Sequence, residues 1–179
     1  MTEATKLPDV SDAEMKQFCA AIGELILWAN LLDRQLNGAL IAMMALPQRA
    51  MIEPIVAQLN PRQKTDLLKS RAKKLRRPDW KNGVIKWIER VEKVNAKRNV
   101  VAHHGIYIAD GKINLFSAQL SKIISSLENA GSTLRPGKPM GLSDILKWIE
   151  EAKAAYVEGN EVVRRMDSAL ANLDVKGKK

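Results

Sequence analysis

Two histidines, an arginine and two asparagines gather within residues 95–104 of this sequence. His103 and His104 are the chain's histidines, and histidine is the side chain that exchanges a proton near neutral pH. Arg98 keeps its positive charge and can hold phosphoryl oxygens with its fork of N–H donors. Together, these residue types could act on a phosphate group.

The apolar pattern that leads into this stretch predicts a helix whose inner face includes Arg98. A guanidinium on such a face needs a carboxylate partner, a bound phosphate or an edge open to water. Glu24 and Asp33, close to the seam of an earlier helix, could supply the carboxylate, so an ion pair and a phosphate site both stay open. The inward positions recur at alternating three- and four-residue steps: Val84, Trp87, Val91, Val94, Arg98 and Val101.

One flank of this helix is polar. Asn95, Asn99 and His103 follow one another at i, i+4 and i+8, so two amides and an imidazole line up beside Arg98. We favour His103 as the functional histidine because it shares this flank with Asn99. His104 remains the alternative, with Asn95 as a further polar group of the site.

Other catalytic motifs are missing from the sequence. It contains no His/Cys cluster, HExxH, paired CxxC, P-loop or GxGxxG, so metal, thiol and dinucleotide chemistries have no support, and neither a metal nor a cofactor is expected. RNA carries its own nucleophile, the 2′-hydroxyl. Cleavage of RNA by transesterification therefore needs only groups that move protons and stabilise charge, as arginine and histidine can.

The positive charge of the chain is concentrated ahead of this stretch. The net charge is +9, and residues 62–98 hold fourteen Lys or Arg against four acidic residues. Such a segment suits a polyanion, because neutralising phosphates supplies affinity that does not depend on sequence. The alternative is a solvated face that keeps the protein soluble. The candidate RNA-binding residues are Lys73, Lys74, Arg76 and Arg77.

Composition points to one helical domain spanning residues 1–179. At 179 residues with 46% apolar side chains, the chain can build a core without disulfides. The lone Cys19 has no partner and is expected in the core, which favours a reducing cytoplasm. Neither a secretory leader nor a membrane span is expected, because the first residues show no basic segment followed by an apolar run and no later apolar run reaches the length of a span. Residues 1–10 and 175–179 are expected to be disordered.

Three helices are predicted before the motif helix. Ser11 and Glu14 form a capping box that opens a helix of about thirty residues. Residues 48–59 form a shorter helix, which Pro54 is expected to bend or break. The third helix is predicted to begin within residues 60–63. Asn60 is the cap, Pro61 takes the first helical position, and Gln63 places an amide three residues after the cap.

The third helix is predicted to run to about Arg77. Leu67, Leu68 and Leu75 are expected to point inward, and Lys64 is expected on the outer face. Asp79 is the candidate cap of the motif helix that follows.

After Gly105 the spacing of the apolar residues changes from the helical three- and four-residue steps to alternation with polar residues. Asp110-Gly111 between two apolar runs predicts a β-hairpin, because a two-residue type I′ turn needs positive φ at both positions. In that register Ile106 faces Leu115 and Ile108 faces Ile113, which fixes the pairing of the strands.

The last third of the chain returns to helix. A short helix is predicted within residues 117–130, followed by a Pro- and Gly-rich loop over 131–141. Ser143-Asp144 is expected to cap a final helix to about Leu173, in which Gly159 could introduce a kink.

The run Arg98-Asn99-Val100-Val101-Ala102-His103 resembles the signature of the HEPN superfamily: an arginine, four to six residues, then a histidine, often with a polar residue after the arginine. The motif covers six residues, and the similarity in helix order spans about residues 12–174. The resemblance implies an all-α helical bundle and a homodimer that brings two Arg/His sets into one groove.

The same resemblance implies a function. Many HEPN proteins are metal-independent endoribonucleases, including toxins paired with an antitoxin protein, and others are non-catalytic modules for RNA or nucleotide binding or for dimerisation. Carried over to this sequence, Arg98 would hold the phosphate, Asn99 would orient it or the histidine, and His103 would transfer the proton. RNA is the expected ligand, and a second copy of the chain the expected partner.

Overall fold

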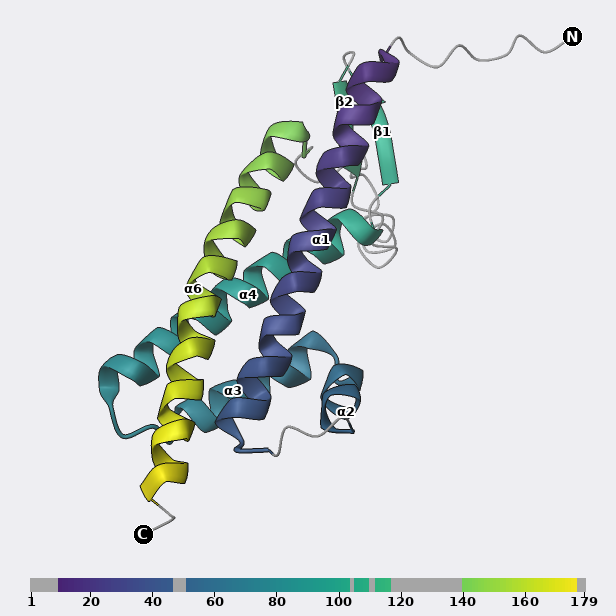
Figure 1. Cartoon of the computed structure of the whole chain (residues 1–179). Coiled ribbons are helices and arrows are strands. Elements are labelled where there is room, and N and C mark those ends of the chain that lie inside the picture. The colour runs from purple at the N-terminus through teal and green to yellow at the C-terminus, as the bar shows by residue number, and fades with distance from the viewer. Residues whose placement is uncertain (1–9, 47–50, 104, 110–111, 117–139, 177–179) are drawn as a thin grey trace, which may run out of the picture. The chain divides into compact units, whose positions relative to one another are not determined.

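The computed structural model of this protein describes residues 10–46, 51–103, 105–109, 112–116 and 140–176. The predicted fold class, an all-α helical bundle with a small β-hairpin after the motif helix, is confirmed. The elements are α1 (Asp12–Met43), α2 (Ile52–Gln58), α3 (Pro61–Ala72), α4 (Pro78–His103), β1 (Gly105–Ala109), β2 (Lys112–Phe116) and α6 (Leu142–Lys176) (Figure 1).

These elements divide into two compact units, and each of α1, α4 and α6 contributes to both. Unit 1 comprises residues 1–25 and 97–149, and unit 2 comprises residues 26–96 and 150–179. The Arg-x4-His motif lies in unit 1, whereas the candidate RNA-binding cluster lies in unit 2.

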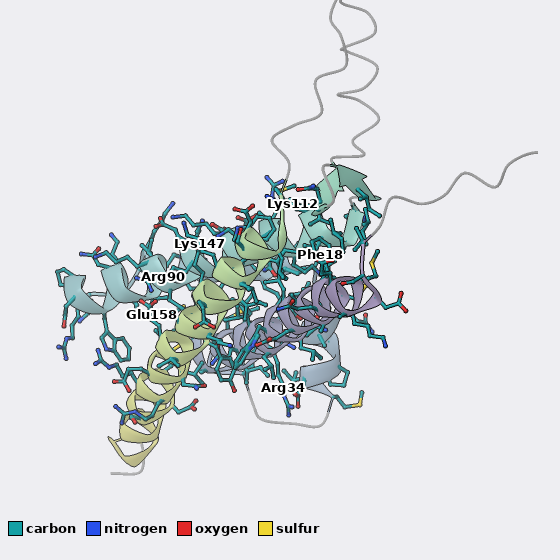
Figure 2. The ribbon with its side chains drawn as sticks, turned by 90° about the horizontal axis from the view of Figure 1, so that it is seen from above. Phe18, Arg34, Arg90, Lys112, Lys147 and Glu158 are labelled. Atoms are coloured by element: carbon teal, nitrogen blue, oxygen red, sulfur yellow. The ribbon has the colours of Figure 1, made fainter. Side chains whose placement is uncertain are left out.

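The hairpin of unit 1 has the predicted register. β1 and β2 pair antiparallel, with Ile106 opposite Leu115 and Ile108 opposite Ile113. Ile113 and Leu115 are buried, and Phe18 of α1 is buried in the same unit beside the hairpin (Figure 2). The hairpin begins two residues after His103, so the strand that leaves the motif is anchored by this apolar face.

The start of α1 confirms one prediction and corrects another. Ser11 and Glu14 form the expected capping box: Glu14 N donates to Ser11 Oγ over 3.2 Å, and Ser11 N donates to Glu14 Oε2 over 3.1 Å. Cys19, however, is exposed. Phe18, Ala21 and Leu25 define the buried face, and Cys19 lies roughly 120° from its centre on an ideal helix, so the prediction of a core cysteine was wrong.

In unit 2, the three long helices meet closely at Gly159. Trp87 of α4 is fully buried, and its Nε1 donates to Ala155 O of α6 over 3.1 Å. Gln35 of α1 donates from Nε2 to Tyr156 O over 2.9 Å. A Cβ atom on Gly159 would overlap Gln35 Oε1 and would lie only 2.6 Å from Trp87 Nε1. α6 is continuous through this point, and Gly159 permits close packing there.

Gly159→Ala is expected to lower the free energy of unfolding by about 1–3 kcal/mol, because the new methyl group has no room beside the rigid Trp87 ring. Urea denaturation measures this. Gly83→Ala on α4 is the matched control: no atom lies within 4 Å of the position that its new methyl group would take, so it should stabilise the helix by up to about 1 kcal/mol. Equal stabilisation by both substitutions would contradict the close packing at Gly159.

Helix α3 begins as predicted and ends earlier. Asn60 Oδ1 accepts from Gln63 N over 2.9 Å, and Asn60 N donates to Gln63 Oε1 over 3.0 Å, which completes the capping box before Pro61. The helix ends at Ala72 and not near Arg77. The N–H groups of Lys74 and Leu75 donate to carbonyl groups three residues earlier. These bonds form a tighter turn after the helix, and α4 follows it.

The buried face of α3 also differs from the prediction. Lys64, expected to face solvent, is 1% exposed, and its Nζ lies 2.7 Å from Asp33 Oδ2 of α1. Leu67, expected to point inward, is 39% exposed. The buried positions include Lys64, Leu68 and Ala72, since the long aliphatic stem of lysine can fill apolar space while its ammonium group reaches a carboxylate.

Pro54 and Asp79 occupy helix starts in ways that the sequence did not reveal. Pro54 lies in the first turn of α2, where its missing N–H has no intrahelical partner, so the helix is unbroken from Ile52 to Gln58. α4 begins at Pro78, so Asp79 is inside its first turn and is not the cap.

The final helix also begins differently. It runs from Leu142 to Lys176, and Asp144 Oδ2 accepts from Gly141 N over 3.1 Å. Asp144 therefore lies within the first turn, and its side chain bonds back to the residue before the helix. Ser143 also lies within the first turn and is not the cap. The inward positions Ile145, Ile149, Ala152 and Met166 are buried as predicted.

Several predictions fall outside the described residues. These are the Asp110-Gly111 turn, the short helix within 117–130, most of the loop over 131–141, and residues 1–9 and 177–179 of the two chain ends. Residues 175 and 176, predicted to be disordered, belong instead to the last turn of α6. The single domain over residues 1–179 stays a prediction. Among the described helices, none combines the length and the apolar character needed to cross a membrane.

Candidate active site

Helix α4 places the motif as its apolar pattern predicts. Five of the six inward positions are buried, whereas Arg98 is half-buried. The buried valines and Trp87 hold this face of the helix against its neighbours, so the rotation of the last turn is fixed. Arg98 consequently stands at the edge of the inner face, where its guanidinium stays open to water. The buried positions are Val84, Trp87, Val91, Val94 and Val101.

Arg98 is held by an amide and not by a carboxylate. Its Nη1 donates to Asn99 Oδ1 over 3.0 Å. None of the ion pairs in the described part of the chain involves Arg98, and Asp33, one of the carboxylates considered for it, pairs with Lys64. A neutral amide orients the guanidinium without cancelling its charge. Arg98 can therefore still bind an anion.

His103 is the last residue of α4 and is exposed. On an ideal helix it leaves the axis about 140° from Arg98 but only about 40° from Asn99. The bond from Arg98 to Asn99 draws the guanidinium toward the flank that carries His103. The structure thus joins Arg98 with Asn99 and places His103 one turn further on from Asn99, and Arg98 and His103 are not hydrogen-bonded to each other.

The remaining candidates of the motif are partly placed. Asn95 is half-buried on α4, one turn before Asn99. His104 lies outside the described residues, so the preference for His103 stays a prediction.

Lys97 contributes a contact that sequence reasoning missed. Its Nζ lies 5.8 Å from the centre of the Trp148 ring of α6, within the range of a cation–π interaction. Both residues belong to unit 1, so the contact ties the last turns of α4 to the start of α6 beside Arg98. Nothing in the local sequence pairs two residues this far apart.

In unit 2, the candidate RNA-binding cluster lies at the turn between α3 and α4, and all four of its side chains are exposed. Lys73, Lys74 and Arg76 take part in none of the ion pairs of the described residues. Arg77 Nη2 lies 2.9 Å from Asp79 Oδ2, and this hydrogen bond lowers the pKa of the Asp79 carboxyl. Three of the four cations are thus available to a polyanion.

Other cations of the basic segment already serve the fold of unit 2. Besides Lys64, Lys69 Nζ lies 2.6 Å from Glu92 Oε2, which links α3 to α4. Arg90 of α4 and Glu158 of α6 point toward each other, with Nη1 and Oε2 3.3 Å apart (Figure 2). The local charge surplus therefore combines structural ion pairs with an exposed cluster, and its total overstates the charge available to a ligand.

Unit 1 contains a hollow of about 370 Å³ between α1, β2 and the start of α6, with Phe18, Lys112 and Asn114 in its wall. Arg98, Asn99 and His103 do not line it. Asn99 and His103 are exposed and Arg98 is half-buried, so the motif lies at the surface of α4, outside this hollow.

Within the described residues, no group of three or more His, Cys, Asp or Glu side chains could hold a metal ion. No family model, curated protein or solved structure matches this chain.

Proposed function

We propose that this protein is a metal-independent endoribonuclease of the HEPN type that works as a homodimer. The observation that carries the proposal is the arrangement at the end of α4. Arg98 stands at the edge of a buried face and is oriented by Asn99 through a 3.0 Å bond, with the exposed His103 one turn along the same flank. This arrangement puts a positive charge, bonded to Asn99, and an exposed proton-transfer group on successive turns at the end of α4.

The proposed reaction is transesterification. The 2′-hydroxyl oxygen of the RNA attacks the adjacent phosphorus and loses its proton, and the bond from phosphorus to the 5′ oxygen breaks as that oxygen gains a proton. The products are a 2′,3′-cyclic phosphate and a 5′-hydroxyl. Arg98 would stabilise the negative charge on the non-bridging oxygens, and Asn99 would keep the guanidinium oriented. His103 would transfer a proton.

A second copy would supply what one chain lacks. The reaction removes one proton and delivers another, and each chain offers one favoured histidine for the two tasks. Two Arg98/His103 sets facing each other would also enclose the RNA, which the open surface of one copy does not. If the protein is a toxin, an antitoxin protein would be its further partner.

The proposal is tested by incubating the purified protein with single-stranded and structured RNA in the presence of EDTA. Cleavage products that end in a 2′,3′-cyclic phosphate support it. Binding without cleavage favours the second candidate, a non-catalytic RNA-binding module, for which the exposed Lys73, Lys74 and Arg76, outside every ion pair of the described residues, are the supporting observation. If the protein neither binds nor cleaves RNA, both candidate functions are ruled out.

The exposed cluster makes a separate prediction about salt dependence. Replacing Lys73, Lys74, Arg76 and Arg77 with serine should weaken RNA binding for all sequences. It should also lower the slope of log affinity against log salt by roughly 0.7 to 0.9 for each lost phosphate contact. Fluorescence anisotropy at several salt concentrations measures the slope.

Single replacements sharpen this test. Arg77→Ser should change the slope less than Arg76→Ser, because Asp79 already shares the charge of Arg77. Lys16→Ser, an exposed cation of α1 outside the basic segment, serves as control and should leave the slope nearly unchanged. If the fourfold variant keeps the original slope, these residues only contribute solubility.

A further inference from the structure

The parts of α1 and α6 that belong to unit 2 line a groove on its surface. Within this unit the two helix segments lie side by side and run in the same direction (Figure 1). Gln35 bonds to Tyr156 and Asn160, and one turn further Gly38 faces Val163, with 4.0 Å from its Cβ position to Val163 Cγ1. The groove between them has a volume of about 450 Å³.

Apolar side chains lie exposed in or next to this groove. Leu31 lines it and is 38% exposed, and Leu27, one turn before, is 64% exposed. On α6, Val157 is 69% exposed beside the lining residue Tyr156. Gly38 leaves the floor of the groove free of a side chain. A groove with exposed apolar residues at one end and a bare floor further along suits a protein surface as its occupant.

The charges of the groove identify the occupant. Arg34 and Asp167 both line it and are exposed, and neither forms an ion pair or hydrogen bond with another described residue (Figure 2 shows Arg34 at the surface of α1). Arg164 also lines the groove but is occupied, since it donates two 2.9 Å bonds to Glu161. Arg164 and Arg165 lower the pKa of Glu161 to about 2, so Glu161 stays charged and keeps them engaged.

Arg34 and Asp167 are also placed symmetrically. Arg34 lies four residues before Gly38, and Asp167 lies four residues after Val163, which faces Gly38. Because the helices are parallel, the two charges lie about one helical turn to either side of this level. A two-fold axis that lies in the interface near Gly38, at right angles to the line joining Arg34 and Asp167, brings each Arg34 opposite the partner's Asp167.

We propose that this α1/α6 groove is the interface between two copies of the chain, closed by two reciprocal ion pairs between Arg34 and Asp167. The proposal deepens the homodimer on which the proposed function rests, but it draws on the side chains of unit 2 alone. It also accounts for the exposed leucines and for two opposite charges that pair with no other described residue in one groove.

Charge reversal tests the interface in the full-length protein. Wild-type protein should sediment as a dimer at micromolar concentration. Arg34→Asp and Asp167→Arg should each weaken dimerisation at least about tenfold, because each variant alone opposes like charges at both contacts. A 1:1 mixture of the two variants should recover the dimer, because each of the two contacts in a mixed dimer joins opposite charges. One contact joins the two wild-type side chains, and the other joins the two reversed ones. Lys86→Asp, an exposed reversal on α4 outside the groove, is the control and should remain dimeric.

The outcomes are separable from those of the ribonuclease proposal. A monomeric wild type, variants that stay dimeric, or a double variant Arg34→Asp/Asp167→Arg that stays monomeric would each overturn the interface. The interface is established if each single variant is monomeric and the chain that carries both reversals is dimeric. If these monomers and dimers also cleave RNA at the wild-type rate, the composite active site is refuted.

Discussion

Replacing His103 with alanine is expected to abolish metal-independent RNA cleavage, lowering the rate by about 10²- to 10⁴-fold, the usual contribution of one general acid or base. The fold should be unaffected. His103 is exposed at the last position of α4, and none of the side-chain hydrogen bonds of the described residues involves it, so truncation removes little packing. Single-turnover cleavage with EDTA measures the rate, and urea denaturation measures the stability.

Arg98→Ala and His104→Ala are the companion variants. Arg98→Ala should also abolish cleavage, and it should lower stability only slightly, because the guanidinium is half-buried and bonded to Asn99 rather than to a buried carboxylate. His104→Ala should retain activity. The reverse pattern for the two histidines would exchange their roles. An activity that survives both substitutions would place the active site elsewhere.

Replacing Asp33 with alanine should lower the free energy of unfolding by about 3 kcal/mol, the second large effect expected for this protein. Lys64 is 1% exposed, and its ammonium group lies 2.7 Å from Asp33 Oδ2. Without Asp33, that charge would stay buried beside no acidic partner, and the lysine would have to lose its proton or open the α1–α3 contact to water. Chemical denaturation at neutral pH measures the loss.

A double-mutant cycle separates the ion pair from simple packing. Lys64→Met should cost less than Asp33→Ala, because the Asp33 side chain is 32% exposed and water can hydrate the carboxylate that is left. Combining the two substitutions should recover much of the loss caused by Asp33→Ala, since no unpaired charge is then buried. Additive losses would mean that the two side chains do not interact energetically.

Features with local causes could be predicted from the sequence. Both capping boxes need only residues three apart, and the structure contains both. The register of the hairpin follows from alternation alone, because a shift by one residue would turn Ile113 and Leu115 away from the core. The inward face of α4 was likewise set by its own spacing.

Features that depend on a distant neighbour could not be predicted. Lys64 looked like one more surface cation, and only the position of Asp33 on α1 explains its burial. Cys19 looked apolar enough for the core but lies outside the face that Phe18 and Leu25 define. The end of α3 was placed too late, because no glycine or proline follows Ala72 in the sequence before Pro78 and the helix ends instead in a tightened turn.

For the candidate site, the sequence supplied the order of the groups along the helix but not their contacts. The flank shared by Asn99 and His103 follows from helical periodicity. That Arg98 bonds to Asn99 and not to a carboxylate depends on a side-chain rotamer and on where the acidic residues of other helices lie. The Lys97–Trp148 contact joins residues on two different helices, so no single helix could reveal it.

The single residue between α4 and β1 imposes a limit on chain length. β1 starts at Gly105, and its pairing with β2 puts Ile113 and Leu115 in the core of unit 1. An insertion or deletion at position 104 would either turn His103 by about 100° around the helix or shift β1 by one residue against β2, which would break the pairing that holds Ile113 and Leu115 in the core. Substitutions can accumulate around this junction, but variants of this protein that keep their fold should keep the spacing between the motif and the hairpin unchanged.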